Sequence, residues 1–169
     1  MAECKTKDLE ETEDLEETED LEETEGLEDD EEESEDLWTA SDPELKDVMA
    51  VFRTIHDPRI FIAPNLNSEK YHNAIDSYAP KIWPADVLLH VDNTFFGGAK
   101  EGLLVTPDAI YLKELFKSPL EIKIAAGTTF ALSGRTLAVD GTKVFSFRKA
   151  APAEMEKIVR GLRLLAAKK

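Results

Sequence analysis

Residues 120–147 read LEIKIAAGTTFALSGRTLAVDGTKVFSF, and this stretch decides the fold. Its apolar residues first alternate with charged ones, which is the period-two pattern of a half-buried antiparallel strand. Further along, Asp140-Gly141 is a strong hairpin signal between two alternating segments. Short strands are therefore expected over 120–124, 129–132, 136–139 and 143–147.

The same period extends upstream to about residue 85, where further strands are expected over 87–91, 102–106 and 109–113. The last two flank the tight turn Thr106-Pro107-Asp108. Seven short strands follow one another with connections too short for parallel crossovers, so the sheet must be antiparallel.

Helical periodicity replaces the strand pattern after Pro152, which suits the first turn of a helix. The helix is expected to run to about residue 166 and to bury its apolar stripe against the open end of a small barrel. The stripe consists of Met155, Ile158, Val159, Leu162 and Leu165.

Two helices are expected before the strands. Ser41-Asp42-Pro43-Glu44 is a capping-box pattern, and apolar residues then recur at helical spacing to about residue 55. A second helix is expected over 68–78, because Pro80 ends its pattern. Together they predict a helical leader, residues 37–82, that packs on a domain formed by residues 83–169.

Residues 1–36 hold 21 acidic and two basic side chains, including three copies of Asp-Leu-Glu-Glu-Thr-Glu. Their leucines recur every six residues, which places no apolar stripe on a helix. We therefore expect a disordered acidic tail. Its role is left open between an arm for a basic partner and a solubilising segment.

The remaining 133 residues are nearly balanced, with 15 acidic and 18 basic side chains. No basic stripe with interleaved aromatic residues occurs in them, so nucleic-acid binding is not expected. Cys4 is the single cysteine, which fits a reducing compartment. Without a secretory signal or a long apolar run, the expected location is the cytoplasm and no transmembrane segment is expected.

The central run VDNTFFGGAKEGLLVT, residues 91–106, followed by Ala109-Ile110-Tyr111, resembles the opening of bacterial pleckstrin-homology-like (GRAM-related) domains. Ile62-Ala63-Pro64 and the segment 73–79 resemble the helical leader of such proteins. The resemblance implies an α+β fold: a seven-stranded antiparallel, partly open barrel that is capped by a C-terminal helix.

The candidate binding loop lies in this run and consists of Phe95, Phe96, Gly97, Gly98 and Lys100. Its glycines suit a connection that needs positive φ or close backbone approach. They could form an anion cradle with Lys100, or they could only satisfy the geometry of the loop. Glu101 offsets that lysine, a departure from pleckstrin domains that bind phosphoinositides with several Lys and Arg.

His90 and Asp92 are the one pair that could support catalysis or a metal, because residues two apart on a strand share a face. No further ligand stands at metal-binding spacing, and no nucleophile motif or phosphate-binding P-loop occurs. We therefore expect a structural histidine, no catalytic residue, no metal and no cofactor.

These observations predict a non-catalytic adaptor that binds a protein partner or assembles with copies of itself. The contact would use an exposed sheet edge or the candidate loop. The alternative is a peripheral sensor that binds anionic lipid, weakly, or a small anion through that loop.

Overall fold

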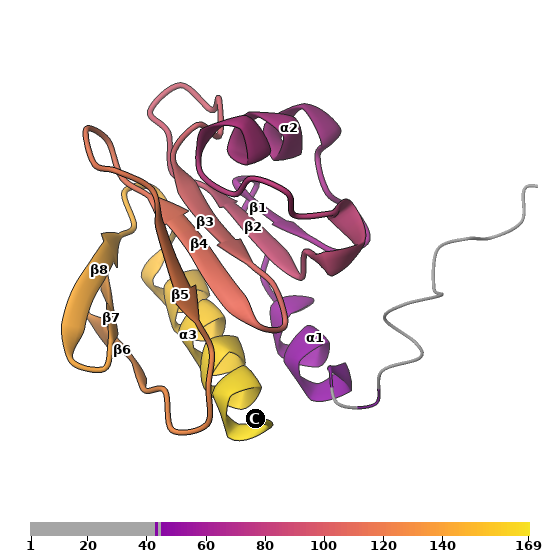
Figure 1. Cartoon of the computed structure of the whole chain (residues 1–169), viewed down its shortest axis with the longest axis vertical. Helices are drawn as coiled ribbons and strands as arrows, with labels where there is room; N and C mark the ends of the chain where they lie inside the picture. The colour runs from indigo at the N-terminus through magenta and orange to yellow at the C-terminus, as the bar shows by residue number, and fades with distance from the viewer. Residues whose placement is uncertain (1–42, 44) are drawn as a thin grey trace, which may run out of the picture. The chain divides into compact units, whose positions relative to one another are not determined.

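The computed structural model describes Pro43 and residues 45–169, which all belong to a unit running from Glu33 to Lys169. In this part of the chain, two antiparallel sheets are packed with three α-helices (Figure 1). The five-stranded sheet has the order β1-β2-β3-β4-β5, and the three-stranded sheet has the order β6-β7-β8. Every neighbouring pair is antiparallel.

The strands of the larger sheet are β1 (Ile60–Ile62), β2 (Leu89–Asp92), β3 (Gly102–Val105), β4 (Ala109–Lys113) and β5 (Leu120–Lys123). Those of the smaller sheet are β6 (Phe130–Ser133), β7 (Thr136–Val139) and β8 (Thr142–Ser146). The turn between β7 and β8 is formed by Asp140 at φ 48° and Gly141 at φ 77°, as type I′ geometry requires.

The α-helices are α1 (Lys46–Phe52), α2 (Ser68–Ser77) and α3 (Pro152–Ala167), and a short 3-10 helix, η1, covers Pro84–Asp86. α2 begins where the Asn67 side chain accepts a hydrogen bond from the backbone N–H of Lys70, an N-cap interaction. α3 begins with Pro152, whose missing N–H costs nothing in a first turn.

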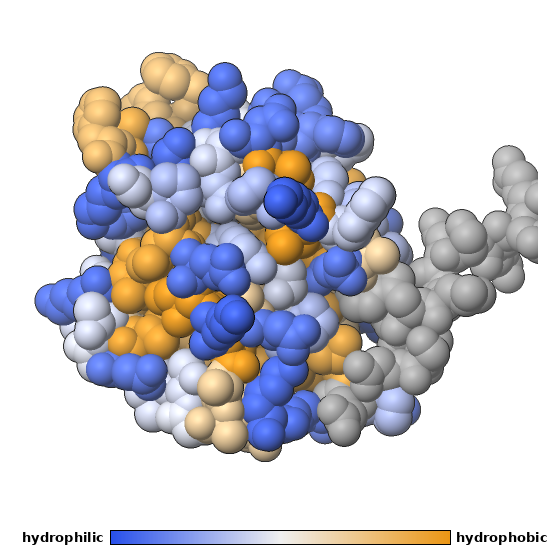
Figure 2. Space-filling model, in the orientation of Figure 1, coloured by the Kyte–Doolittle hydropathy of each residue, from blue (hydrophilic) through white to orange (hydrophobic). Residues whose placement is uncertain are grey.

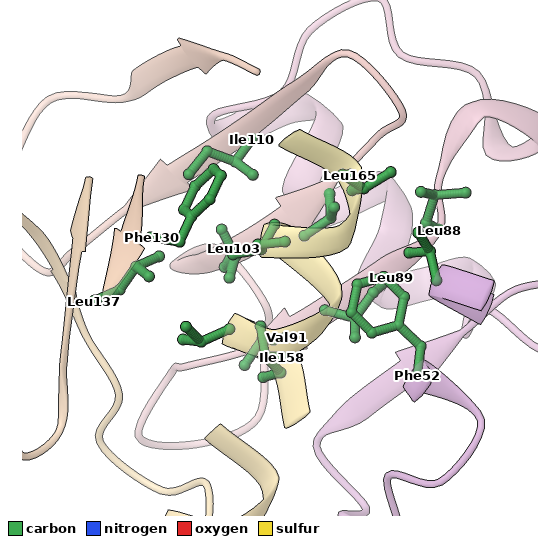
Figure 3. Close-up of a cluster of buried hydrophobic side chains, with 14 of the residues drawn as sticks. Phe52, Leu88, Leu89, Val91, Leu103, Ile110, Phe130, Leu137, Ile158 and Leu165 are labelled. Atoms are coloured by element: carbon green, nitrogen blue, oxygen red, sulfur yellow. The ribbon is translucent and has the colours of Figure 1, made fainter. Parts of the chain in front are cut away.

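The main core lies between the sheets, α1 and α3, and Figure 3 shows its side chains pointing toward one another. Because side chains alternate along each strand, the two faces of the larger sheet pack against different parts of the domain. Leu103 and Val105 belong to this main core, whereas Leu104 packs with α2 on the opposite face of the sheet. The central strands of the larger sheet are therefore covered on both sides, whereas β5 at its edge is largely exposed, so the ends and edges of the sheet are free to contact other molecules.

The predicted antiparallel α+β fold with a C-terminal helix packed on the sheets is confirmed. The seven predicted strands correspond to β2–β8, but the predicted total of seven is wrong, because β1 adds an eighth. β1 has only three residues, too few to show alternation, and its strand conformation depends on pairing with β2, 27 or more residues away. Through β1, the segment predicted as a helical leader also supplies a strand to the sheet.

Other differences are local. α1 ends at Phe52 rather than near residue 55, and it begins at Lys46 with Leu45 as its N-cap. No strand pairing joins the two sheets of the described region, so they form no closed barrel. The predicted disordered acidic tail, residues 1–36, lies outside the described residues, as does most of the capping box.

Candidate functional site

The site is built at one end of the larger sheet, called here the loop end. It carries the β2–β3 connection (93–101) and the β4–β5 connection (114–119), which an antiparallel meander places at the same end. Both project beyond the sheet at the top of Figure 1. The segment after β8 (147–151) completes it.

Hydrogen bonds tie these three segments together. The Asn93 side chain donates to the carbonyl of Ser146 over 2.9 Å and accepts from the backbone N–H of Arg148 over 2.8 Å. The Ser146 N–H donates to Glu114 over 2.9 Å. The loop end is thus a joined platform to which both sheets contribute.

Asp92, the last residue of β2, anchors the β2–β3 connection through its side chain. Its side chain is buried, and its Oδ1 accepts hydrogen bonds from the N–H and hydroxyl of Thr94 and from the N–H of Ala99. Its Oδ2 forms an ion pair with Lys70 of α2 over 2.9 Å. Burial opposes ionisation of Asp92, but the hydrogen bonds from Thr94 and Lys70 outweigh it and hold the pKa of that carboxyl below its ordinary value.

The carboxylate of Asp92 therefore occupies the inner side of the loop. The backbone N–H groups of Thr94 and Ala99 that face inward already bind it, over 3.0 and 3.3 Å. A bound anion would have to compete with this internal anion for the same donors. What the anchored loop presents to the outside is its tip.

The tip of the loop is apolar. Phe95 and Phe96 are 63% and 94% exposed, and their rings contact each other edge to face at 5.0 Å. On the neighbouring β4–β5 connection, Phe116 is 96% exposed. Of the six exposed large hydrophobic side chains in the described region, five lie at the loop end: Phe95, Phe96, Leu115, Phe116 and Leu120. Hydrophobic atoms accordingly protrude over these loops at the upper left of Figure 2.

Phe116 is unfavourable in its place by two independent criteria. Its backbone has φ 63°, a left-handed conformation that bulky side chains rarely adopt. Its side chain gains almost nothing from burial. Neither local conformation nor packing accounts for a phenylalanine here, which favours a role in contacting another molecule.

Several cationic side chains lie on the segments that form the loop end. Lys149 lies over the ring of Phe95, with its Nζ 4.7 Å from the ring centre, a cation–π contact. Arg148 precedes Lys149 in the chain and Lys100 belongs to the β2–β3 connection, and both are exposed. Lys117 is exposed on the second connection and forms an ion pair with Glu114. The loop end thus combines an apolar tip with a mainly positive margin.

The five residues predicted for the candidate loop are therefore placed as follows. Phe95 and Phe96 form the tip, and Gly97 adopts φ 81°, as a positive-φ turn requires. Gly98 has open space where a side chain would stand. Lys100 is exposed, and its backbone carbonyl accepts a hydrogen bond from Ser77 of α2 over 2.7 Å.

Sequence reasoning missed Leu115, Phe116 and Lys149. The available signal was the pair Leu115-Phe116 within a short connection between two strands, where polar residues are usual. Their location at the same end of the sheet as Phe95 and Phe96 depends on sheet order, which no local pattern encodes.

His90 and Asp92 do share a face of β2, the one covered by α2. His90 is fully buried, and its Nε2 is 3.2 Å from the hydroxyl of Tyr78. Its Nδ1 has no hydrogen-bond partner within the described region. Burial lowers the pKa of His90 to about 4, although the charge of Asp92 opposes the shift. This histidine is neutral at neutral pH and is packed inside the domain.

The buried His90 predicts acid sensitivity. An unfolded histidine titrates near pH 6.5, whereas His90 in the fold titrates near 4, so the unfolded chain binds an extra proton between these values. The stabilisation is complete above about pH 6.5 and is lost as the pH falls toward 4, by about 3 kcal/mol of unfolding free energy. Urea titrations across this range should show the slope, and His90→Gln should flatten it. An equal slope in both proteins would contradict this assignment.

A pocket of about 270 Å³ lies near the opposite end of β2, between α2 and η1. Tyr71, Leu66, Pro64 and Pro84 give it a mainly apolar lining. The polar His72 at its rim is already bonded through Nδ1 to the carbonyl of Ser68 over 2.7 Å. No charged residue belongs to the lining, so the pocket does not fit an anion.

No family model, curated protein or solved structure matches the chain. Within residues 45–169, no helix has the length and apolar character to cross a bilayer. The described side chains also contain no group of three His, Cys, Asp or Glu that could hold a metal ion.

Proposed function

We propose that the chain is a non-catalytic binding module that contacts its partner through the loop end. The observation that carries this proposal is the cluster of exposed phenylalanines at the tips of two neighbouring connections. Exposed apolar side chains gathered in one place are characteristic of interaction surfaces, whereas isolated ones are ordinary. The anchoring of the loop through Asp92 and Asn93 supports the same function, because an ordered tip loses little conformational entropy on binding.

The fold proposed for this module is the pleckstrin-homology-like, partly open barrel. Two facts support it: the sequence run 91–106 that resembles such domains, and two antiparallel sheets with α3 packed between them and α1. On that arrangement β1 is an addition that pairs with the first strand of the barrel. A protein partner or a second copy of the chain, in the cytoplasm, is the expectation from sequence.

The test compares two exposed aromatic sites in the same protein. The double variant Phe95→Ser/Phe96→Ser alters the tip, and Trp83→Ser alters a side chain that is 73% exposed near the other end of the sheet. Because neither site is packed, both variants should unfold within about 0.5 kcal/mol of wild type.

We expect the tip variant to lose the contacts that the full-length wild type makes, and Trp83→Ser to keep them. Two measurements report such contacts: molar mass by light scattering against concentration, and crosslinking in the source cell. If both variants retain every contact of the wild type, the loop end is not the binding surface.

A further inference from the structure

We propose that the loop end docks on the surface of an anionic bilayer, with Phe95, Phe96 and Phe116 entering the interfacial layer. This inference rests on the proposed function and names its partner. Three features of the described residues support a lipid surface over a protein: the shape of the apolar tips, the sign of the charge around them, and the way the loop interior is filled.

The apolar residues stand on projections. Phe95 and Phe96 lie on one connection and Phe116 on another, and the two project in the same direction from the sheet (Figure 1). A protein partner would need a matching pocket for each tip, because contact energy at protein interfaces comes from side chains packed in pockets. A bilayer interface is fluid and accepts separate tips without prior complementarity.

The charge around the tips suits anionic lipid. Lys100, Arg148 and Lys149 are exposed, and no hydrogen bond or ion pair to a carboxylate holds their side chains in the described region. Of the nearby acids, Glu114 is already bonded to Lys117 and to the N–H of Ser146, which leaves Glu101. Basic residues beside inserted aromatic side chains add attraction to the negative surface of a bilayer.

The loop interior argues against a headgroup pocket. Asp92 occupies the inner donors of the β2–β3 connection, so a phosphate is not held inside the loop. Recognition is then by surface charge and apolar insertion, without preference among anionic headgroups. The acidic residues 1–36 repel the same surface, which makes the association of the full chain weak and reversible.

Co-sedimentation of the full chain with vesicles tests the proposal. One set contains phosphatidylcholine alone, and the other contains phosphatidylcholine with about 30% phosphatidylserine, near the anionic content of a charged leaflet. We expect binding to the anionic set alone, and weaker binding as salt is added. Phe95→Ser/Phe96→Ser and Arg148→Glu/Lys149→Glu should each reduce the bound fraction about 10-fold. Trp83→Ser is the matched control and should bind as wild type does.

The outcomes separate this inference from the proposed function. Absence of binding to anionic vesicles, or equal binding by the tip variant and wild type, overturns the membrane proposal. If the wild type does not bind the vesicles but the tip variant still loses a contact with a protein or a second copy, the proposed function stands and only the partner is wrong. If neither vesicles nor any other contact distinguishes the tip variant from Trp83→Ser, both proposals fall.

Discussion

Replacing Gly102 with valine is expected to reduce the free energy of unfolding by about 5 kcal/mol, enough to unfold a typical domain. A Cβ at this position would lie 2.1 Å from the carbonyl oxygen of Val91 and 2.9 Å from the hydroxyl of Tyr78. The first contact is with backbone, which cannot rotate away. The β2–β3 ladder would have to separate at Asp92, and overpacking would add to the lost hydrogen bonds.

Gly98→Val provides the matched control for this change. Gly98 lies four residues earlier, in the connection that leads into β3, its φ is not in the left-handed region, and nothing stands within 4 Å of the added Cβ. We expect it to change stability by about 0.5 kcal/mol or less. Urea denaturation followed by circular dichroism measures both variants. Similar midpoints for the two would show that β2 and β3 are not paired as described.

Replacing Asp92 with alanine is the second change for which we expect a large loss of stability. The change removes the acceptor for three hydrogen bonds to the loop and leaves Lys70 without its partner. Breaking a buried pair by removing one member costs about 3–5 kcal/mol, and we expect about 4 kcal/mol here because Lys70 is only 23% exposed. Asp57→Ala, which removes a single hydrogen bond to the N–H of Arg59, should cost about 1 kcal/mol.

Asp92→Asn separates the two functions of the carboxylate, which are to accept hydrogen bonds from the loop and to pair with Lys70. Its Oδ1 can still accept from Thr94 and Ala99, but the charge that pairs with Lys70 is gone. We expect an intermediate loss of stability and a loop that keeps its shape. Amide hydrogen exchange at Ala99 should therefore accelerate strongly in Asp92→Ala and much less in Asp92→Asn. Equal acceleration in both would place the anchoring in the ion pair alone.

Much of the fold follows from local pattern. Alternation around Asp140-Gly141 predicts β7 and β8 because the turn and its strands are adjacent in sequence. β1 could not be predicted in this way, since Ile60–Ile62 becomes a strand only by pairing with β2. Similarly, the spacing of His90 and Asp92 predicts that they share a face of a strand, but only the docking of α2 brings Lys70 to Asp92.

The candidate site, like the fold, can be predicted only in part from local sequence. The pair Phe95-Phe96 beside two glycines stands out in the sequence, and the structure places both side chains at an exposed tip. Lys149 joins them because the end of β8 meets the β2–β3 connection, through contacts such as Asn93 to Ser146. Phe116 lies at the same end of the sheet because of the meander. Convergence of separate loops is a property of sheet order, so a motif search along one segment cannot find it.

The central claim, that the loop end presents exposed aromatic tips for contact with a partner surface, can be measured directly with Phe96→Trp in a Trp83→Phe background. Subtracting the emission of the background variant isolates the introduced tryptophan. The account predicts that acrylamide quenches this emission readily in the free protein, and that anionic vesicles shift it to shorter wavelength and protect it. Emission that is already protected in the free protein would contradict this claim, whereas exposed emission that does not respond to the vesicles would contradict the bilayer as the partner surface.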